Sequence, residues 1–444
     1  MRVFLSSGLE FSSTSIYDEI YGYIDTTELE LQIIDTPLFQ RLNHLKQLGM
    51  TYRVFPGAHH TRFSHSLGVM YIIDKMSQNL GLCSEDQEKM RIAALLHDIG
   101  HYPFSHTIEV VLTTHNKNEN ATHEKFGTHI INNSSIKDIL KKNYSDEDIL
   151  EISSIIEGSS SSPLNNQMMS SELDADRLDY LIRDAMHTGV AYGRIDLDRI
   201  LHTLALDEEG YLSIKEEGKH AAEGYIIGRY LMWATVYTHK TTAGFDEIIQ
   251  HLYPLIVGSE YTSIEELEKL SEEELTKFDD AYVLSKIHEN CRNEKNEYVS
   301  DLCKRFVKRD HLELVDEAKM LSADKEAQQK YYRLDAYQYP VQLKALSEIS
   351  GVDENWIFHN NSSTQFPSLK PIIEKTISGE EEGGKEMQKL LRIKKNGKSI
   401  PLVNDNSSIV YNLKDLSFDV VRIFSKNKEF KSKLLSGIGK QWEK

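Results

Sequence analysis

The sequence predicts a mainly α-helical protein with a smaller α+β part towards its C-terminal end. Apolar residues recur at the spacing of amphipathic helices in residues 86–97, 223–240 and 263–291. Two other segments favour strands. Residues 205–214 suit a hairpin, and residues 407–424 are rich in β-branched and aromatic side chains.

Residues at the ends of these segments indicate where the elements begin and end. Gly100 and Pro103 follow the first helical segment and end it, because neither residue continues a helix easily. Gly210 lies at the expected turn of the hairpin. Ser171, with Asp174 three residues later, fits a capping box that begins a new helix after a serine-rich loop.

Length and composition suggest how many compact parts the chain has. A chain of 444 residues, 40% of them hydrophobic, exceeds one ordinary core and suggests two or three subdomains. We expect a core over residues 1–290 and a C-terminal α+β region over residues 291–444 that serves oligomerisation or regulation. A Gly- and Glu-rich run at residues 379–384 is predicted to be exposed and to separate the last part of the chain.

The charge and the cysteine content argue against several classes of protein. Asp and Glu total 69 against 51 Lys and Arg, and the resulting net charge of −18 repels nucleic acid at long range. We identify no apolar run long enough to cross a bilayer and no apolar core of a secretory signal near the first residue. The three cysteines lack the spacing of a metal site, which fits a reduced, cytoplasmic setting.

The strongest local signal is the pair His97-Asp98 at the end of a predicted helix. Imidazole and carboxylate groups both bind divalent cations, and two adjacent residues at a helix end can face one ion. With His65 upstream and Asp176 downstream, the set predicts one site for manganese, iron, magnesium or zinc. Because the chain has 18 histidines, a surface or packing role is the alternative for any one of them.

The helix predicted after Asp174 gives a second signal. At 100° per residue, one arc of about 100° carries Asp176, Arg177, Tyr180, Asp184 and His187. A solvated helix face explains the charged residues but accounts less well for the tyrosine and the histidine. A metal ligand beside a cation and an aromatic ring is typical of a nucleotide pocket.

A third signal lies in residues 229–240. Arg229, Trp233, Tyr237 and Lys240 fall on one face of a helix drawn with the same spacing. Cations beside aromatic rings suit an anionic ligand that contains a ring. The alternative is a buried amphipathic helix whose ends carry solvated charges.

Five segments, taken together and in this order, resemble the HD-domain phosphohydrolases. The wider match is to the deoxynucleoside triphosphate triphosphohydrolases, including the mammalian SAM-and-HD-domain enzyme and its bacterial relatives. This resemblance implies an HD-domain helical bundle, hydrolysis of a deoxynucleoside triphosphate to deoxynucleoside and triphosphate, and a homo-oligomer, either a dimer or a tetramer. The matching segments are residues 33–49, 55–69, 94–106, 174–190 and 229–240.

The resemblance also implies roles for the matched residues. The metal would be held by His65, His97, Asp98 and Asp176. The residues beside the α-phosphate would be His101 and His106, with His123 nearby. The triphosphate would contact Arg62, Arg177, Arg229 and Lys240. The sugar region would contact Gln47, Tyr180 and Asp184, and the base or sugar side would be lined by Tyr237.

Two departures from the family concern catalysis and regulation. His106 is the expected proton donor to the leaving 5′ oxygen, and Glu109, a supporting candidate, stands where the mammalian enzyme has an Asp. Asp35 and Gln40 match part of a regulatory guanine-nucleotide site of the mammalian-type enzymes, whereas Asn43 replaces an Arg of that site. Losing this cation weakens the case for activation by GTP.

Two alternative functions remain open at this point. Other HD phosphohydrolases cleave nucleoside monophosphates, cyclic dinucleotides or nucleic acid, although the several candidate cations here favour a triphosphate. The chain is alternatively a nucleotide-binding regulator without turnover. Loss of a metal ligand would be the usual sign of such a regulator, and all four candidate ligands are present.

Overall fold

The computed structural model describes most of the chain as two compact units that interleave along the sequence. The described residues are 9–115, 118, 120–292, 295–320, 325–363, 390–395, 397–413 and 419–442. The first unit takes residues up to Met232, Val257–Leu284 and Ile372–Asn412, and the second takes Trp233–Ile256, Ser285–Pro371 and residues from Leu413 onward. The predicted functional division at residue 290 stays a prediction. The predicted exposed run at residues 379–384 lies outside the described residues.

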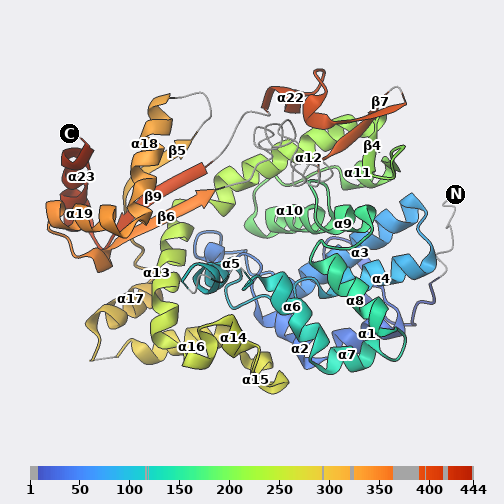
Figure 1. Ribbon diagram of the computed structural model, residues 1–444, viewed down its shortest axis with the longest axis horizontal. Helices are drawn as coiled ribbons and strands as arrows, with labels where there is room; N and C mark the ends of the chain where they lie inside the picture. Colours follow the sequence, from blue (N-terminus) through green and yellow to red (C-terminus); the bar gives the residue numbers. More distant parts are fainter. Residues whose placement is uncertain are drawn as a thin grey trace. The chain divides into compact units, whose positions relative to one another are not determined.

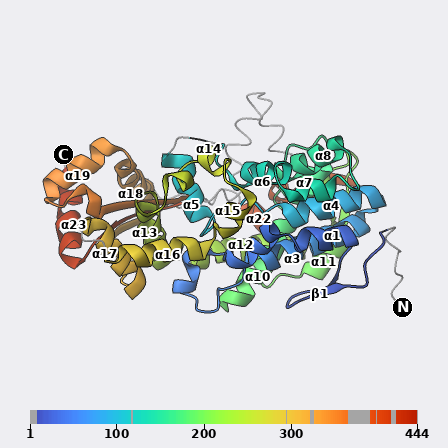
Figure 2. The ribbon, with the colours of Figure 1, turned by 90° about the horizontal axis from the view of Figure 1, so that it is seen from below.

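The first unit is mainly helical, as the sequence predicts. The long helices α3 and α4 lie side by side, and α10 packs on α3 (Figures 1 and 2). Its described helices are α1 (Glu28–Ile34), α2 (Pro37–Gln40), α3 (Arg62–Leu80), α4 (Ser84–Leu96), α5 (His106–Val110), α6 (His123–Asn132), α7 (Ser135–Leu140), α8 (Asp146–Ile156), α9 (Pro163–Met169), α10 (Ala175–Thr188), α11 (Leu197–His202), α12 (Lys219–Met232), α14 (Ile264–Leu267), α15 (Glu272–Lys277) and α22 (Ile409–Leu413). Helix α16 (Asp280–Asn290) begins in this unit and ends in the second.

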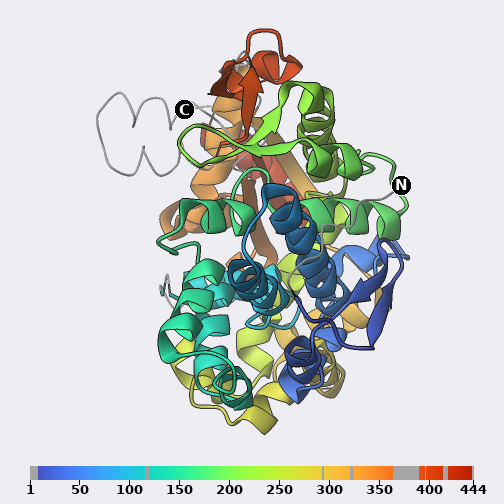
Figure 3. The same cartoon turned by 90° about the vertical axis from the view of Figure 1, so that its right-hand side faces the viewer.

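Two small sheets belong to the first unit. Strands β1 (Ser15–Asp18) and β2 (Gly22–Asp25) form an antiparallel hairpin. The other sheet has the order β3-β4-β7-β8, and Figure 3 shows the green strands β3 and β4 near the red β7 and β8. Its strands are β3 (Leu204–Leu206), β4 (Leu212–Lys215), β7 (Arg392–Lys395) and β8 (Lys398–Pro401). The predicted hairpin over residues 205–214 is therefore confirmed, with Gly210 in its turn at φ +83°.

The second unit is built on a three-stranded antiparallel sheet in the order β5-β9-β6. The central strand is buried along its whole length, and α18 and α23 pack on β5. The strands are β5 (Glu313–Met320), β6 (Ile357–Ser363) and β9 (Asp419–Ser425). The helices are α13 (Lys240–Ile256), α17 (Glu297–Lys308), α18 (Lys325–Asp335), α19 (Pro340–Ser350) and α23 (Lys428–Trp442). The predicted small α+β part near the C-terminal end is confirmed.

The helix predicted over residues 263–291 is broken into α14, α15 and α16. The hydroxyls of Ser263 and Ser271 each cap a new helix by accepting a backbone N–H. Phe278 then leaves helical geometry before α16 begins at Asp280. The apolar spacing identified the helical character, but serine caps within the segment set shorter boundaries.

The helix predicted over residues 223–240 is also interrupted. Helix α12 ends at Met232, Trp233–Tyr237 form a π-helical turn, and α13 begins at Lys240. A π-helical turn has more residues than an α-helical turn, so the 100° arithmetic fails beyond Met232. The prediction that Arg229, Trp233, Tyr237 and Lys240 share one helix face is therefore wrong, because the α-helix that carries Arg229 ends at Met232.

Two further boundaries differ from the prediction. Residues 407–424 do not form one strand region, since Ile409–Leu413 are helical while Asp419–Ser425 form β9. The carboxylate of Glu223 accepts the N–H of Ile409 and supports the short helix. The predicted capping box at Ser171 is shifted, because Asp174 is the N-cap and its carboxylate accepts the N–H of Arg177.

Within the described residues, none of the helices is long and apolar enough to cross a bilayer.

Buried charges join the helices that carry the first unit's core. The guanidinium of Arg91 on α4 pairs with Glu30 of α1 at 2.7 Å and with Asp74 of α3 at 2.8 Å. All three residues are less than 5% exposed. Burial lowers the pKa of Arg91, but both carboxylates outweigh burial and raise it above its usual range. The arginine therefore remains charged and holds three helices together.

Arg91→Ala should destabilise the first unit strongly. The substitution leaves Glu30 and Asp74 buried without their cation, and breaking a buried ion pair in this way costs about 3–5 kcal/mol. The free energy of unfolding in urea measures the loss. Lys277→Ala is the control, because Lys277 and its partner Glu273 are both exposed, and its unfolding midpoint should stay near that of the wild type. Equal midpoints for the two variants would contradict the role given to Arg91.

Candidate metal centre and active site

Three segments far apart in the sequence meet at one place in the first unit. His65 lies in the first turn of α3, His97 and Asp98 follow α4, and Asp176 lies in the first turn of α10. The first three residues are buried, while the side chain of Asp176 is 36% exposed. Packing of α4 and α10 against α3 thus gives a buried site with one ligand at its open side.

The four predicted metal ligands lie close together. Nε2 of His65 lies 3.0 Å from Oδ1 of Asp176 and 3.8 Å from Oδ2 of Asp98. Nε2 of His97 lies 3.3 Å from Oδ1 of Asp98. Ligand atoms of His65, His97 and Asp98 are all within 4.8 Å of one another. The structure therefore brings together two imidazoles and two carboxylates, a donor set that suits a divalent cation.

Hydrogen bonds at the far side of each imidazole leave the Nε2 atoms able to bind a cation. Nδ1 of His97 bonds to the carbonyl of Ala94 at 2.7 Å, and Nδ1 of His65 bonds to the carboxylate of Asp179 at 2.7 Å. When Nδ1 carries the proton, Nε2 carries a lone pair. Neither buried Nε2 makes a hydrogen bond to any residue that the structure describes. Such atoms fit a metal ion better than a packing role.

The electrostatics of the centre also favour a cation. Burial lowers the pKa of His65, but the carboxylates of Asp176 and Asp179 outweigh burial and raise it to about 10, so a cation that binds Nε2 would displace a proton from it. Burial works to raise the pKa of Asp98, but Arg62 and His97 hold it well below its usual range. The carboxylates at this site therefore stay ionised and attract positive charge, which a divalent cation would supply.

Asp179 also belongs to the candidate site, although it is not among the residues predicted from the sequence. Besides His65, its carboxylate accepts hydrogen bonds from the guanidinium of Arg183 at 2.9 Å and from the hydroxyl of Tyr21 at 2.8 Å. Asp179 lies three residues after Asp176, so it faces α3 one helical turn further along α10. This spacing is the signal for Asp179 in the sequence, and this residue lies just outside the polar arc that contains Asp176 and Tyr180.

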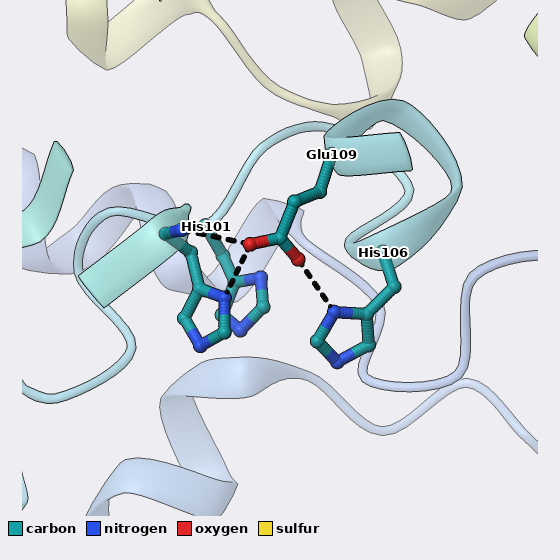
Figure 4. A group of neighbouring side chains, drawn as sticks. His101, His106 and Glu109 are labelled. Atoms are coloured by element: carbon teal, nitrogen blue, oxygen red, sulfur yellow. Dashed lines mark hydrogen bonds and ion pairs between the residues drawn. The ribbon is translucent and has the colours of Figure 1, made fainter. Parts of the chain in front are cut away.

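A second group of side chains consists of His101, His106, Glu109 and His123, of which Figure 4 labels the first three. The carboxylate of Glu109 bonds to Nδ1 of His106 at 2.7 Å and to Nδ1 of His123 at 2.9 Å. The rings of His101 and His123 stack with centroids 3.7 Å apart. All four predicted catalytic residues are therefore neighbours, and Glu109 occupies the centre rather than the edge of the group.

Charges within this group set which imidazole holds a proton. Burial lowers the pKa of His123, but Glu109 outweighs burial and raises it. Burial and the cation of Arg62 hold the pKa of His101 well below its usual range. Burial works to raise the pKa of Glu109, whereas His123 and His106 hold it far below its usual range. The group therefore contains an ionised carboxylate between His123, whose imidazolium form it favours, and the exposed side chain of His106.

Backbone packing and a strained turn bring the two groups together. Nε2 of His101 lies 3.1 Å from Oδ1 of Asp98, so these residues join the groups. A Cβ at Gly100 would lie 2.1 Å from the carbonyl oxygen of His123, which means that α6 packs directly on this turn. Phe104 and Ser105 both have positive φ, 54° and 55°, just before α5 begins at His106.

The predicted phosphate-binding arginines are held by protein partners. Nη1 of Arg62 lies 2.6 Å from Oδ2 of Asp98, and its Nε donates to the hydroxyl of Ser105 at 2.8 Å. The guanidinium of Arg177 pairs with the carboxylate of Asp174. Arg62 is therefore at the centre itself, and a phosphate would compete with Asp98 for it.

Tyr180, a predicted sugar contact, interacts electrostatically with Arg229, a predicted phosphate contact. Burial raises the pKa of the Tyr180 hydroxyl, while Arg229 and Arg177 work to lower it.

Asp184, another predicted sugar contact, pairs with buried His60 at 2.7 Å, and His60 is not among the residues predicted from the sequence. The adjacent sequence His59-His60 gave only a weak signal for it, because isolated histidines are more often packing residues.

The backbone of Gln47 is hydrogen-bonded within the protein, whereas its side-chain oxygen is available to a ligand. Its N–H donates to the carbonyl of His60 at 3.0 Å. Its Oε1 is buried and bonds to none of the residues that the structure describes. A buried amide oxygen in this state is a good acceptor for a ligand hydroxyl.

The remaining predicted residues lie at the end of α1, in α2 and in the second unit. Tyr237 and Lys240 belong to the second unit, in the π-helical turn and at the start of α13. Asp35 is the exposed C-cap of α1. Gln40 donates to the carbonyl of Ile34 at 2.8 Å and accepts from Asn43 at 3.1 Å. A regulatory nucleotide at Asp35 and Gln40 stays a prediction.

Gly68→Ala should weaken metal binding by displacing Asp179. A Cβ at Gly68 would lie 1.9 Å from Oδ1 of Asp179 and 2.5 Å from the guanidinium of Arg183. Because Asp179 orients His65, we expect a loss of about 10–100-fold in metal affinity, measured by calorimetry with Mn²⁺.

The matched control for this glycine is Gly224→Ala. Gly224 lies inside α12, and no described atom approaches within 4 Å of its added Cβ. Since alanine favours helix, this variant should be as stable as the wild type or more stable, with unchanged metal affinity. Equal affinities for both variants would contradict the support role of Asp179.

The sequence matches two known families in adjacent parts of the chain. The family described as HD domain matches residues 62–184, and the family described as HD associated region matches residues 195–368. The first range contains all four candidate ligands together with His101, His106, Glu109 and His123.

Relatives and a solved structure extend this similarity. The uncharacterized protein YwfO of Bacillus subtilis is 32% identical over 378 residues, which cover 79% of each chain. The uncharacterized protein MJ1154 of Methanocaldococcus jannaschii is 37% identical over 266 residues, 59% of this chain, and the match spans about half (54%) of that relative. A hypothetical protein from Aquifex aeolicus has a TM-score of 0.72 at 27% identity, covering 96% of this chain and 99% of the other.

A named enzyme matches a smaller part of the chain. The deoxynucleoside triphosphate triphosphohydrolase SAMHD1 of Bos taurus is 35% identical over 209 residues, 39% of this chain and 36% of that protein. The similarity to YwfO covers most of both chains, and the HD domain match contains every candidate ligand. The chain therefore belongs to the HD-domain proteins that carry an HD associated region.

Proposed function

We propose that this chain hydrolyses deoxynucleoside triphosphates to a deoxynucleoside and intact triphosphate. One observation carries the proposal: the buried Nε2 atoms of the two candidate histidine ligands lie beside Asp98, and His101 joins Asp98 to the His106–Glu109–His123 group. A cation site and a proton-donating group thus lie side by side. Hydrolysis of a phosphate ester needs both, one for the phosphoryl charge and one for the leaving oxygen.

The choice of a triphosphate rests on charge and on partial similarity. The chain has a net charge of −18, yet Arg62, Arg177 and Arg229 lie at or near the centre. Clustered arginines in an acidic protein suit a small, highly charged anion. The bovine relative that is named a deoxynucleoside triphosphate triphosphohydrolase is similar over a part of the chain, and this supports the same substrate class.

In this mechanism the protein binds and orients the substrate around a fixed cation site. A divalent cation held by His65, His97, Asp98 and Asp176 would polarise a phosphoryl oxygen and lower the pKa of a water molecule. Arg62 would exchange part of its contact with Asp98 for a phosphate oxygen. The buried Oε1 of Gln47 would accept a hydrogen bond from a sugar hydroxyl.

The second group would supply the proton for the leaving group. Water attacks the α-phosphorus, the bond between phosphorus and the 5′ oxygen breaks, and that oxygen takes a proton. The Nδ1 of His106 is held by Glu109, which directs the opposite Nε2 edge of the ring away from the carboxylate. His106 would therefore donate from Nε2, while the carboxylate of Glu109 stabilises its charged form.

A product assay tests the proposal directly. Each deoxynucleoside triphosphate, ATP and GTP is incubated separately with Mn²⁺ or Mg²⁺, and the products are separated by ion exchange. We expect deoxynucleoside and triphosphate from the wild type and a loss of at least about 10³-fold in the double variant His97→Ala, Asp98→Ala, because the cation acts on the transition state. The control is His220→Ala, an exposed histidine outside both groups.

Products labelled with oxygen-18 water would identify the bond that breaks. Attack at the α-phosphorus places the label in the triphosphate. Label in the deoxynucleoside would contradict the mechanism. Another phosphorylated product would move the assignment to a different phosphoester, and stoichiometric nucleotide binding without product would favour a regulator. Formation of a homo-dimer or tetramer also stays a prediction.

The pH dependence tests the role of Glu109. This carboxylate raises the pKa of His123, so in the wild type the imidazolium is present below that raised pKa and is lost as the pH rises through it. Glu109→Gln removes the negative charge and lowers the pKa of His123. The alkaline limb of kcat/KM should therefore move to lower pH.

The matched control is Glu124→Gln. Glu124 approaches Nε2 of the same histidine at 3.5 Å and is 41% exposed, so water screens its charge. Its alkaline limb should move less than that of Glu109→Gln. Identical profiles for the wild type and Glu109→Gln would exclude His123 from the proton-donating group.

A further inference from the structure

The segment from Phe278 to Asp280 contacts the candidate site from the HD associated region. Asp280, the first residue of α16, is 2% exposed. Its Oδ1 accepts the N–H of Phe104 at 2.8 Å, and its Oδ2 accepts the N–H of Lys46 at 3.1 Å. One carboxylate therefore links the turn before His106 to the segment that carries Gln47.

The turn that Asp280 holds has an unfavourable backbone conformation. Phe104 and Ser105 both have φ near +55°, a left-handed conformation in which a side chain meets its own backbone and the chain is strained. Ser105 is held further because its hydroxyl donates to the carbonyl of Lys46 at 3.0 Å and accepts from Arg62. A strained turn persists only where surrounding contacts fix it, and these contacts do so.

Arg41 makes a second connection from the same segment. This arginine is 2% exposed, and its guanidinium donates to three backbone carbonyls. The acceptors are Phe278 at 2.8 Å, Ile99 at 3.1 Å and His101 at 2.5 Å. The planar guanidinium thus ties the turn after Asp98 to the residue two positions before Asp280.

We propose that Asp280 and Arg41 are positioning residues for hydrolysis, which together fix residues 99–106 against the start of α16. Neither residue contacts a candidate metal ligand side chain. They act through the backbone, by setting where His101 and His106 lie relative to Asp98. The HD associated region thereby supplies part of the active-site geometry. This inference rests on the proposed function and deepens it.

Asp280→Asn tests the proposal with little change of shape. One oxygen becomes an NH₂ group that faces a backbone N–H, so one of the two hydrogen bonds is lost. We expect kcat to fall about 10–100-fold, since small displacements of reacting groups have effects of this size. KM and Mn²⁺ affinity should change by less than about threefold, and hydrogen exchange over residues 101–109 should become faster.

The control variant is Asp405→Asn in the same unit. Asp405 is 3% exposed, pairs with Lys219 at 2.7 Å and accepts the N–H of Ser407 at 3.1 Å, so its surroundings match those of Asp280. It should leave kcat and hydrogen exchange over residues 101–109 unchanged. An equal fall of kcat in both variants, or an unchanged kcat and exchange rate in Asp280→Asn, would overturn the proposal.

The assay uses two substrates so that the two proposals can fail separately. Bis(p-nitrophenyl) phosphate with Mn²⁺ reports general phosphoester hydrolysis, and dATP reports the proposed substrate. Activity on the first alone, reduced in Asp280→Asn, would refute the proposed substrate and support the positioning role. If neither substrate is hydrolysed, the rate of hydrogen exchange over residues 101–109 alone tests the positioning role.

A second variant covers the case in which Asp280→Asn does not fold. Arg41→Lys keeps the charge but replaces the planar donor by one ammonium group, which cannot reach all three carbonyls in the same geometry. Faster exchange over residues 99–106 with an unchanged unfolding midpoint would support the proposal. Unchanged exchange there would overturn it.

Discussion

The buried carboxylate of Asp179 is the interaction on which the candidate site depends most. It bonds to Nδ1 of His65, and this bond sets both the ring orientation and the position of the lone pair. The same carboxylate binds Arg183 and the hydroxyl of Tyr21. An ionised group in a buried site needs several donors, and α10, α3 and the β1–β2 turn supply them. Packing of three elements is thereby coupled to the geometry of one metal ligand.

Sequence and structure agree where the signal is local or where residues act as a recognisable set. The four ligands were predicted because their residue types and order are specific, and the helices because apolar spacing is a local property. The hairpin around Gly210 was equally local. The interruptions were harder to predict: caps at Ser263 and Ser271 and the π-helical turn at Trp233 depend on backbone hydrogen bonds that hydrophobic spacing does not encode.

The residues that support the site were not predictable from one sequence. Asp280 meets Lys46 across 234 positions, and His60 meets Asp184 across 124. The neighbouring residues in the sequence do not distinguish such an aspartate from the many exposed aspartates of an acidic chain. Glu109 was undervalued for a related reason. Its importance comes from the positions of His106 and His123 on either side of its carboxylate, which only the fold supplies.

Helix α16 is shared by the two compact units. It begins at Asp280 in the first unit and passes into the second at Ser285, so the chain crosses between units little more than one helical turn from the carboxylate. The helix that begins at the carboxylate holding the N–H of Phe104 is thus also a segment by which the chain enters the second unit.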